Sequence, residues 1–387
     1  MPLKIAILTL LLLGILNPVL GNRVDEAVGI LVFVTGALVT FLLKSFAKIA
    51  LIFLILVYLA NSWFISGDLR FFLTHDIPYN NDPGVLLATY KSVENGRDYY
   101  ESYKQAQLGR FSQSIIPGDI WGWRLPTIFY IWKIVPGGTL SIYVLYLILA
   151  ATVLYVAFLI NRMFLPENLA LLSPYLIFPY LHFAARDQML LETEWWATFL
   201  FIISIYLLNK KKLFLTTVFL SLTLMVRELF ILPVGLMLVF SIFKNKRLAP
   251  VFLIPLCGFL ILFVYHIWRV SRYIDATGTL FTARLISNGV FFVQQTFAFA
   301  SWEYLLYQIR PLALLAILAI VGTLNLIRTK KYFEGIILSL ALLPFPISFL
   351  RFGTVPYNDY WGIVYVPLAI ILSPLFLRAL SKKPIQN

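Results

Sequence analysis

The sequence predicts an all-α polytopic membrane protein with about twelve transmembrane helices, and three observations lead to this prediction. Hydrophobic residues make up 60% of the 387-residue chain and charged residues only 13%, with a mean hydropathy of +0.86. Soluble domains contain roughly 45–50% apolar and 25% charged residues, so lipid has to solvate much of this chain. The apolar residues form runs close to the roughly 20 residues that cross a bilayer as one helix. Basic residues, finally, collect in alternate short connections between those runs.

The apolar runs define the expected helices, which together make residues 1–387 a single integral membrane domain. The expected spans lie near residues 5–21, 27–43, 47–65, 139–160, 168–184, 188–208, 213–226, 229–243, 249–268, 311–327, 333–350 and 361–377. The first span also fits a signal peptide, because Lys4 and a short apolar core precede Asn17 and Pro18. Cleavage there would leave about eleven helices and the same orientation for the rest of the chain.

The charges predict the orientation. Basic clusters such as Lys210–Lys212, Lys244–Arg247 and Arg328–Lys331 fall on one side, which the positive-inside rule makes cytoplasmic. Of the 18 carboxylates, only Glu167 and Glu334 lie on that side. The formal charge of +13 is therefore a topological signal, and no nucleic-acid footprint remains.

Two long segments, about 66–138 and 269–310, are expected on the outer side. Loops of this length in a compact protein are usually functional, and both contain amphipathic, aromatic stretches that suit interfacial helices. In the first segment, Asp82 and Pro83 are expected to open a helix that Gly96 terminates, with Asp82 as the N-cap. Two interpretations of Asp82 stay open: a helix cap alone, or also a carboxylate that accepts a proton from a hydroxyl nucleophile.

Further polar groups are expected at the same outer level. They are Arg186, Asp187, Glu192, Glu194, Arg227, Glu228, Arg351, Tyr357, Asn358, Asp359 and Tyr360. Arg227 and Glu228 have apolar neighbours on both sides, and ionisable residues beside hydrocarbon usually face a cavity or a partner. They could form a structural ion pair with other helices or bind substrate. Arginine grips phosphate through its planar fork, and a phosphate at a membrane surface most simply belongs to a lipid.

Histidine and cysteine patterns predict no metal site. His182 and His266 lie at the outer ends of expected spans and are interpreted as polar interface residues. His75 lies next to Asp76 but has no second histidine at ligand spacing. Cys257, the single cysteine, is expected to be a small buried hydrophobe. No motif for a soluble cofactor occurs, and a requirement for a divalent metal stays open.

Three stretches occur in a distinctive order. Asp82-Pro83-Gly84-Val85-Leu86-Leu87-Ala88 is followed by Gly96-Arg97-Asp98-Tyr99-Tyr100 and then by Arg124-Leu125-Pro126-Thr127-Ile128-Phe129-Tyr130. An acidic residue that opens a loop helix, followed by a proline-aromatic helix returning to the membrane, resembles the GT-C membrane glycosyltransferases. The similarity is to the protein O-mannosyltransferase and lipid A aminoarabinose transferase branch, over roughly residues 60–240. That family commonly has Asp-Glu where this chain has Asp-Pro, so Asp76 is a rival catalytic position.

The resemblance implies a function on the extracytoplasmic face. A polyprenyl-phosphate-linked sugar would be the donor, and a lipid, glycan or protein hydroxyl would be the acceptor, with inversion at the anomeric carbon. Asp82, or its rival Asp76, would act as general base. Arginines would hold the leaving phosphate. The residues expected to bind substrate are Arg124, Arg186, Asp187, Glu194, Arg227, Glu228, Arg351 and Tyr357.

Two other classes of function stay open, a polytopic transporter or flippase and a lipid-linked polysaccharide polymerase or ligase. Transporters place binding residues near the bilayer midplane, whereas the charges here are expected at outer helix ends. The chain contains no Asn-x-Ser/Thr sequon, which favours a prokaryotic plasma membrane over a secretory pathway.

Overall fold

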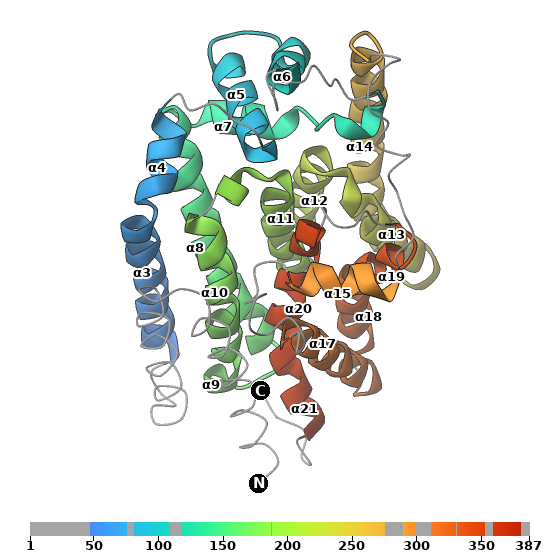
Figure 1. Cartoon of the computed structure of the whole chain (residues 1–387). Helices are drawn as coiled ribbons and strands as arrows, with labels where there is room; N and C mark the ends of the chain where they lie inside the picture. The colour runs from blue at the N-terminus through green and yellow to red at the C-terminus, as the bar shows by residue number, and fades with distance from the viewer. Residues whose placement is uncertain are drawn as a thin grey trace.

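The structure is a computed structural model, and all of its regular structure is helical over the residues that it describes (Figure 1). The described residues are 47–75, 81–108, 118–186, 188–274, 289–298, 311–329, 331–352 and 359–380. The spans expected near 5–21 and 27–43 lie outside them. Every other expected span contains a helix, so the all-α prediction is confirmed for this part of the chain.

The helices fall into a body of apolar helices and a group of shorter loop helices. The body consists of α3 (Ala47–Ile65), α8 (Thr139–Arg162), α9 (Glu167–Ala170), α10 (Leu172–Arg186), η4 (Gln188–Leu191), α11 (Thr193–Asn209), α12 (Leu213–Val226), η5 (Glu228–Phe230), α13 (Ile231–Lys244), η6 (Lys246–Leu248), α14 (Ala249–Val270), α17 (Pro311–Arg328), α18 (Tyr332–Leu342), α19 (Pro344–Phe349), η8 (Asp359–Val364), α20 (Val366–Leu372), η9 (Ser373–Leu375) and α21 (Phe376–Leu380). The loop helices are α4 (Gly67–Thr74), α5 (Asp82–Glu94), α6 (Tyr99–Leu108), η3 (Ile120–Gly122), α7 (Thr127–Ile134) and α15 (Val290–Ala298).

Several body helices have the length and composition of membrane spans. Among the described residues, four helical stretches are long and apolar enough to cross a bilayer, namely Ala47–Phe64, Thr139–Arg162, Lys246–Val270 and Tyr332–Phe349. Large apolar side chains point outward from the body, for example Phe64 with 81% of its surface exposed and Phe214 with 79%. Water would solvate such a surface poorly, whereas lipid solvates it well. The fold is therefore that of a helical membrane protein, and the count of twelve spans stays a prediction.

The position of Cys257 corrects one expectation. The residue is exposed on α14 instead of buried. The physical reason is that α14 is apolar on all sides, so its sequence cannot reveal which face packs against the body and which faces lipid.

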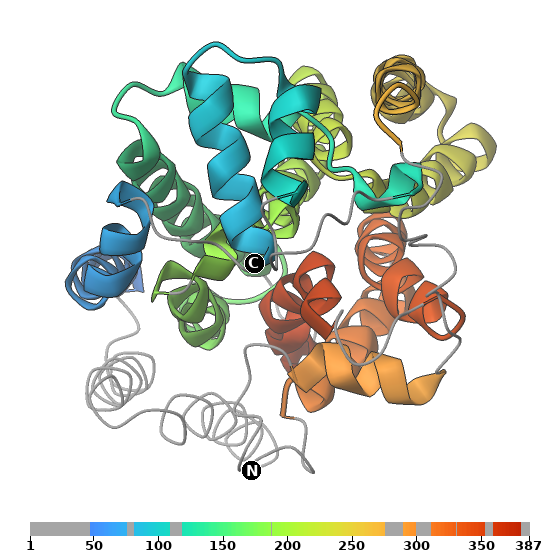
Figure 2. The same cartoon turned by 45° about the horizontal axis from the view of Figure 1, so that its top comes forward.

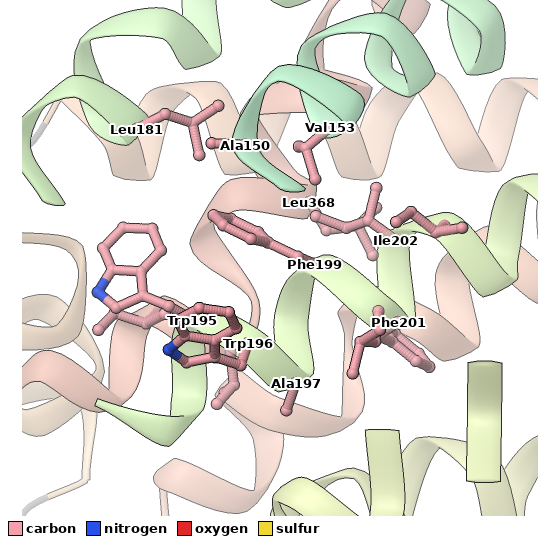
Figure 3. Packing of buried hydrophobic residues seen from close by; sticks show 14 of the residues in the cluster. Ala150, Val153, Leu181, Trp195, Trp196, Ala197, Phe199, Phe201, Ile202 and Leu368 are labelled. Carbon is pink, nitrogen blue, oxygen red and sulfur yellow. The ribbon is translucent and has the colours of Figure 1, made fainter. Parts of the chain in front are cut away.

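The core lies around α11, which is buried on all sides over most of its length. Trp195, Trp196 and Phe199 pack toward Ala150 of α8 and Leu181 of α10 (Figure 3). The two tryptophans pack against Tyr146 of α8 with ring centroids 6.4 and 6.1 Å away. Buried aromatic residues of this size dominate packing energetics. The start of α11 therefore has a well-fixed position.

The helices α5, α6 and α7 lie together at one end of the body, here called the loop end (Figures 1 and 2). The helix expected to begin at Asp82 is α5, but its N-cap is Asn81, whose Oδ1 accepts a hydrogen bond from the Gly84 amide at 2.9 Å. Asp82 is instead the first helical residue and Pro83 the second. Asparagine and aspartate cap equally well, so local geometry decides between neighbours. Gly96 follows the helix with a φ of +86°, which only glycine adopts at no cost.

Polar contacts tie this group of loop helices to itself and to the body. The Tyr99 hydroxyl donates to the carbonyl of Arg124, which connects α6 to the segment before α7. Asp98, just before α6, accepts from Arg269 of α14 at 2.8 Å. The Tyr100 hydroxyl lies 3.2 Å from Nδ1 of His266 on the same body helix. The loop helices thus dock on the body at several points.

The described part of the second long segment contains α15, which packs against η8. The hydroxyls of Thr296 and Tyr365 lie 2.7 Å apart. The contact is close enough that a Cβ at Gly362 would lie 2.0 Å from the carbonyl oxygen of Thr296. Glycine at this position therefore allows α15 to pack directly on the backbone of η8.

Candidate functional site

Arg227 is the centre of a buried group of charges at the loop end. It is an extended residue between α12 and η5, with only 3% of its surface exposed. Its Nε and Nη2 lie 2.9 and 2.8 Å from Oε1 of Glu194, in the first turn of α11. Its Nη1 lies 2.5 Å from Oε1 of Glu228. The guanidinium is thus neutralised by two carboxylates, as a buried charge requires.

Arg124, in the segment before α7, approaches Glu194 and also Glu192 from the loop helices. Its Nη2 lies 3.7 Å from Oε2 of Glu192 and 4.0 Å from Oε1 of Glu194. The same nitrogen donates a hydrogen bond of 3.1 Å to the hydroxyl of Tyr360 in η8. No acceptor among the described residues contacts Nε or Nη1, and 13% of the side chain is exposed. Arg124 therefore has hydrogen-bond donors available for a ligand, whereas the donors of Arg227 already contact Glu194 and Glu228.

Glu192 connects η4 to α11 and has only 1% of its surface exposed. Its Oε2 accepts no hydrogen bond from any described residue, although Arg124 lies within ion-pair distance. Burial, and next the charge of Glu194, raise the pKa of Glu192 to about 8 against the opposing charge of Arg124. This shift favours the neutral form of the Glu192 carboxyl group.

Asp82 reaches this group from the first turn of α5. The helix contacts η4, and Asn81 donates a hydrogen bond of 3.0 Å to Oε1 of Gln188. Asp82 is half-buried, and its charge contributes to raising the pKa values of Glu192 and Tyr360. The Asp82 carboxylate is therefore near enough to act electrostatically on Glu192 and Tyr360 of the body. We call the charged cluster the set Asp82, Arg124, Glu192, Glu194, Arg227, Glu228 and Tyr360.

The other expected site residues have different positions. Arg351 follows α19 and is exposed, with its guanidinium 5.9 Å from the ring centroid of Phe352. Arg186 ends α10, but its side chain is not among those described. Asp76, Asp187 and Tyr357 lie outside the described residues.

Two members of the charged cluster were named among the outer polar groups but not among the expected binding residues. Glu192 lies in an apolar context, as Glu228 does, and this context was the signal that could have selected it. Tyr360 is one of 21 tyrosines and carries no comparable signal. Its contact with Arg124 joins residues 236 positions apart, which only the fold reveals.

The histidines have polar partners in the body. A ring nitrogen of His182 lies 2.5 Å from the side-chain amide of Asn61 in α3. His266 contacts the Tyr100 hydroxyl. Over the described ranges, no group of three or more His, Cys, Asp or Glu side chains is arranged to hold a metal ion.

The composition of the charged cluster limits the chemistry it supports. Four carboxyl groups face two guanidiniums, so the cluster is negative by two charges when every acid is ionised and by one when Glu192 is protonated. A half-buried carboxylate in such a setting suits proton abstraction, and Arg124 offers donors to an anion.

Comparison of the chain with protein-family models, with curated proteins and with solved structures gives no match. The functional argument therefore rests on the residues and on their geometry.

Proposed function

We propose that this protein is a GT-C-type membrane glycosyltransferase that moves a sugar from a polyprenyl-phosphate donor to an acceptor hydroxyl. The observation that carries the proposal is the place of Asp82. A helix of the first long loop holds this carboxylate beside the buried charges at the start of α11 and the end of α12. Arg124, from the same loop, brings guanidinium donors to the carboxylates at the start of α11.

The proposed reaction assigns separate roles to the two sides of the charged cluster. Asp82 accepts the proton of the acceptor hydroxyl as its oxygen bonds to the anomeric carbon. The bond between that carbon and the phosphate oxygen breaks on the opposite face, so the configuration inverts. Arg124, which has uncommitted donors, binds the phosphate that leaves. Arg227 keeps Glu194 and Glu228 in place.

The charge distribution supports an extracytoplasmic site. The charged cluster lies at the start of α11, and Lys210–Lys212 follow its other end. A helix of 17 residues spans about 25 Å, which is close to the thickness of a hydrocarbon core. Basic residues favour the cytoplasmic side, so the loop end faces outward. The absence of sequons from the sequence favours a prokaryotic plasma membrane over a secretory pathway.

Replacing Asp82 by asparagine tests the proposal. Asn81 remains as the N-cap, and loss of a negative charge in the first turn costs a helix only about 0.3–1 kcal/mol. Loss of a general base costs about 10²–10⁴-fold in rate. We therefore expect Asp82→Asn to fold normally and to lose transfer, measured as release of polyprenyl phosphate from lipid-linked sugars by purified protein.

Two matched variants complete the experiment. Asp68→Asn is the control, because Asp68 is exposed in the first turn of α4, in the same loop, and should be active. Asp76→Asn tests the rival base. Activity in Asp82→Asn together with inactivity in Asp76→Asn would assign the base to Asp76. Normal transfer by both the Asp82→Asn and the Asp76→Asn variants would contradict the mechanism and favour a transporter or flippase. A product in which a lipid-linked chain has been extended would favour a polymerase or ligase.

A further inference from the structure

Glu192 is the one carboxyl group of the charged cluster that is both buried and without a hydrogen bond among the described residues. Glu194 and Glu228 each accept from Arg227 at hydrogen-bond distance. Glu192 has only Arg124, at 3.7 Å, and shares that guanidinium with Glu194 and Tyr360.

The surroundings of Glu192 disfavour a negative charge. The charged and titratable groups that act on it come from several neighbouring elements: Asp82 from α5, Arg124 from the segment before α7, Glu194 from α11, Arg227 from the junction of α12 and η5, and Tyr360 from η8. Two of these groups are carboxylates. Burying an ionised carboxylate without a hydrogen bond is unfavourable, and nearby like charges make it more so. A neutral carboxylic acid avoids both.

A protonated Glu192 changes what this end of the cluster offers to a ligand. A carboxylic acid kept neutral by its site donates a hydrogen bond at neutral pH, which a carboxylate does not. The Oε2 atom faces Arg124, whose Nε and Nη1 have no acceptor among the described residues. Together the two side chains present donors from one place, and an oxyanion with several acceptor oxygens matches them.

We propose that Glu192 binds the phosphate of the lipid substrate as a neutral acid, by donating a hydrogen bond to a phosphate oxygen beside Arg124. This inference rests on the proposed function, because it concerns the phosphate of the same reaction. It makes Glu192 a substrate-binding residue whose proton, rather than its charge, is required. Ionisation would replace the donor with a negative charge and would repel the phosphate.

The test measures binding of polyprenyl phosphate, the reaction product, to the purified full chain in lipid nanodiscs between pH 7 and pH 9. The phosphate loses its own second proton near pH 6, so it stays a dianion throughout this range. A group of pKa about 8 that must stay protonated weakens binding about tenfold from pH 7 to pH 9. We expect this fall for the wild-type protein and for Glu101→Gln, which changes an exposed residue of α6.

Two substitutions separate a hydrogen-bond donor from a structural role. Glu192→Gln keeps a neutral donor, so we expect binding at pH 7 within about threefold of wild type and no fall up to pH 9. Glu192→Ala lacks the donor, and we expect binding about tenfold weaker at pH 7 and equally flat, as for loss of one hydrogen bond to a charged group. Wild-type binding that is constant from pH 7 to pH 9, or a Gln variant as weak as the Ala variant, would overturn the proposal.

Further measurements show whether the bound phosphate belongs to a lipid or is free phosphate. They also show whether a negative result contradicts the role of Glu192 or the proposed function. Inorganic phosphate should compete weakly, because the lipid chain contributes apolar contact. Inorganic phosphate that binds as tightly, with the same pH dependence, would keep the role of Glu192 but contradict a lipid substrate. The expected binding behaviour without any sugar transfer would contradict the proposed function alone. Transfer that depends on Asp82, combined with pH-independent product binding, would contradict the role of Glu192 alone.

Discussion

Replacing Arg227 by methionine is expected to destabilise the protein strongly rather than only to reduce its activity. Methionine has a similar length and no charge, so the change leaves Glu194 fully buried with its main partner removed. Breaking a buried ion pair by removing one partner costs about 3–5 kcal/mol. Glu228 has 21% of its side chain exposed and regains solvent, so most of the cost comes from Glu194. Arg124, 4.0 Å away, compensates for only part of the lost contact.

The same reasoning predicts a rescue. Adding Glu194→Gln to Arg227→Met removes the uncompensated charge, so the double variant should be more stable than Arg227→Met alone. Thermal unfolding of the purified variants in detergent, followed by circular dichroism, gives the comparison. Arg351→Met is the matched control, since Arg351 is exposed and its loss should change stability by less than about 0.5 kcal/mol. Wild-type stability in Arg227→Met, or a double variant less stable than the single one, would refute the reasoning.

Two further predictions concern the packing of α15 and the orientation of the chain. Gly362→Ala places a Cβ 2.0 Å from the carbonyl oxygen of Thr296, so we expect α15 to detach from η8. The backbone amides of α15 should then exchange hydrogen faster than in the wild-type protein. Unchanged exchange would mean that η8 shifts at little cost. In a Cys257→Ser background, a cysteine introduced at Ser112 should react with an impermeant thiol reagent added to intact cells, and one at Asn245 should not. The opposite labelling pattern would invert the proposed topology.

The sequence predicts the body helices well because their boundaries are marked chemically. The helix α12 runs over Leu213–Val226 as expected, since lysines precede its apolar run and Arg227 follows it. Two features have no such mark. An Asn-Asp pair offers two equivalent caps, and only the local backbone selects Asn81. An apolar helix such as α14 looks the same on its lipid-facing and packed sides, which is why Cys257 was misplaced.

For the candidate site, the sequence likewise predicts that the charged residues lie at helix ends, but it does not predict which of them contact one another. The cost of placing charge next to hydrocarbon predicts that Glu194, Arg227 and Glu228 lie at helix ends, and they do. Periodicity carries no information about which charge meets which. The contact between Arg227 and Glu194 joins residues 33 positions apart, and that between Arg124 and Tyr360 joins the first long loop to η8. Pairing depends on how α11, α12 and η8 pack, and that packing is a property of the whole fold.

The two arginines of the charged cluster differ in a way that bears on the order of events in the proposed reaction. Arg227 is committed to carboxylates, so Arg124 and the proton on Glu192 together set how much negative charge the site tolerates. A lipid-linked sugar donor is a phosphodiester with a single negative charge, whereas the released phosphomonoester carries nearly two at neutral pH. The negative surroundings therefore repel the product more than the donor. Ionisation of Glu192 widens this difference, so raising the pH should weaken product binding more than donor binding and should speed the release of the lipid phosphate.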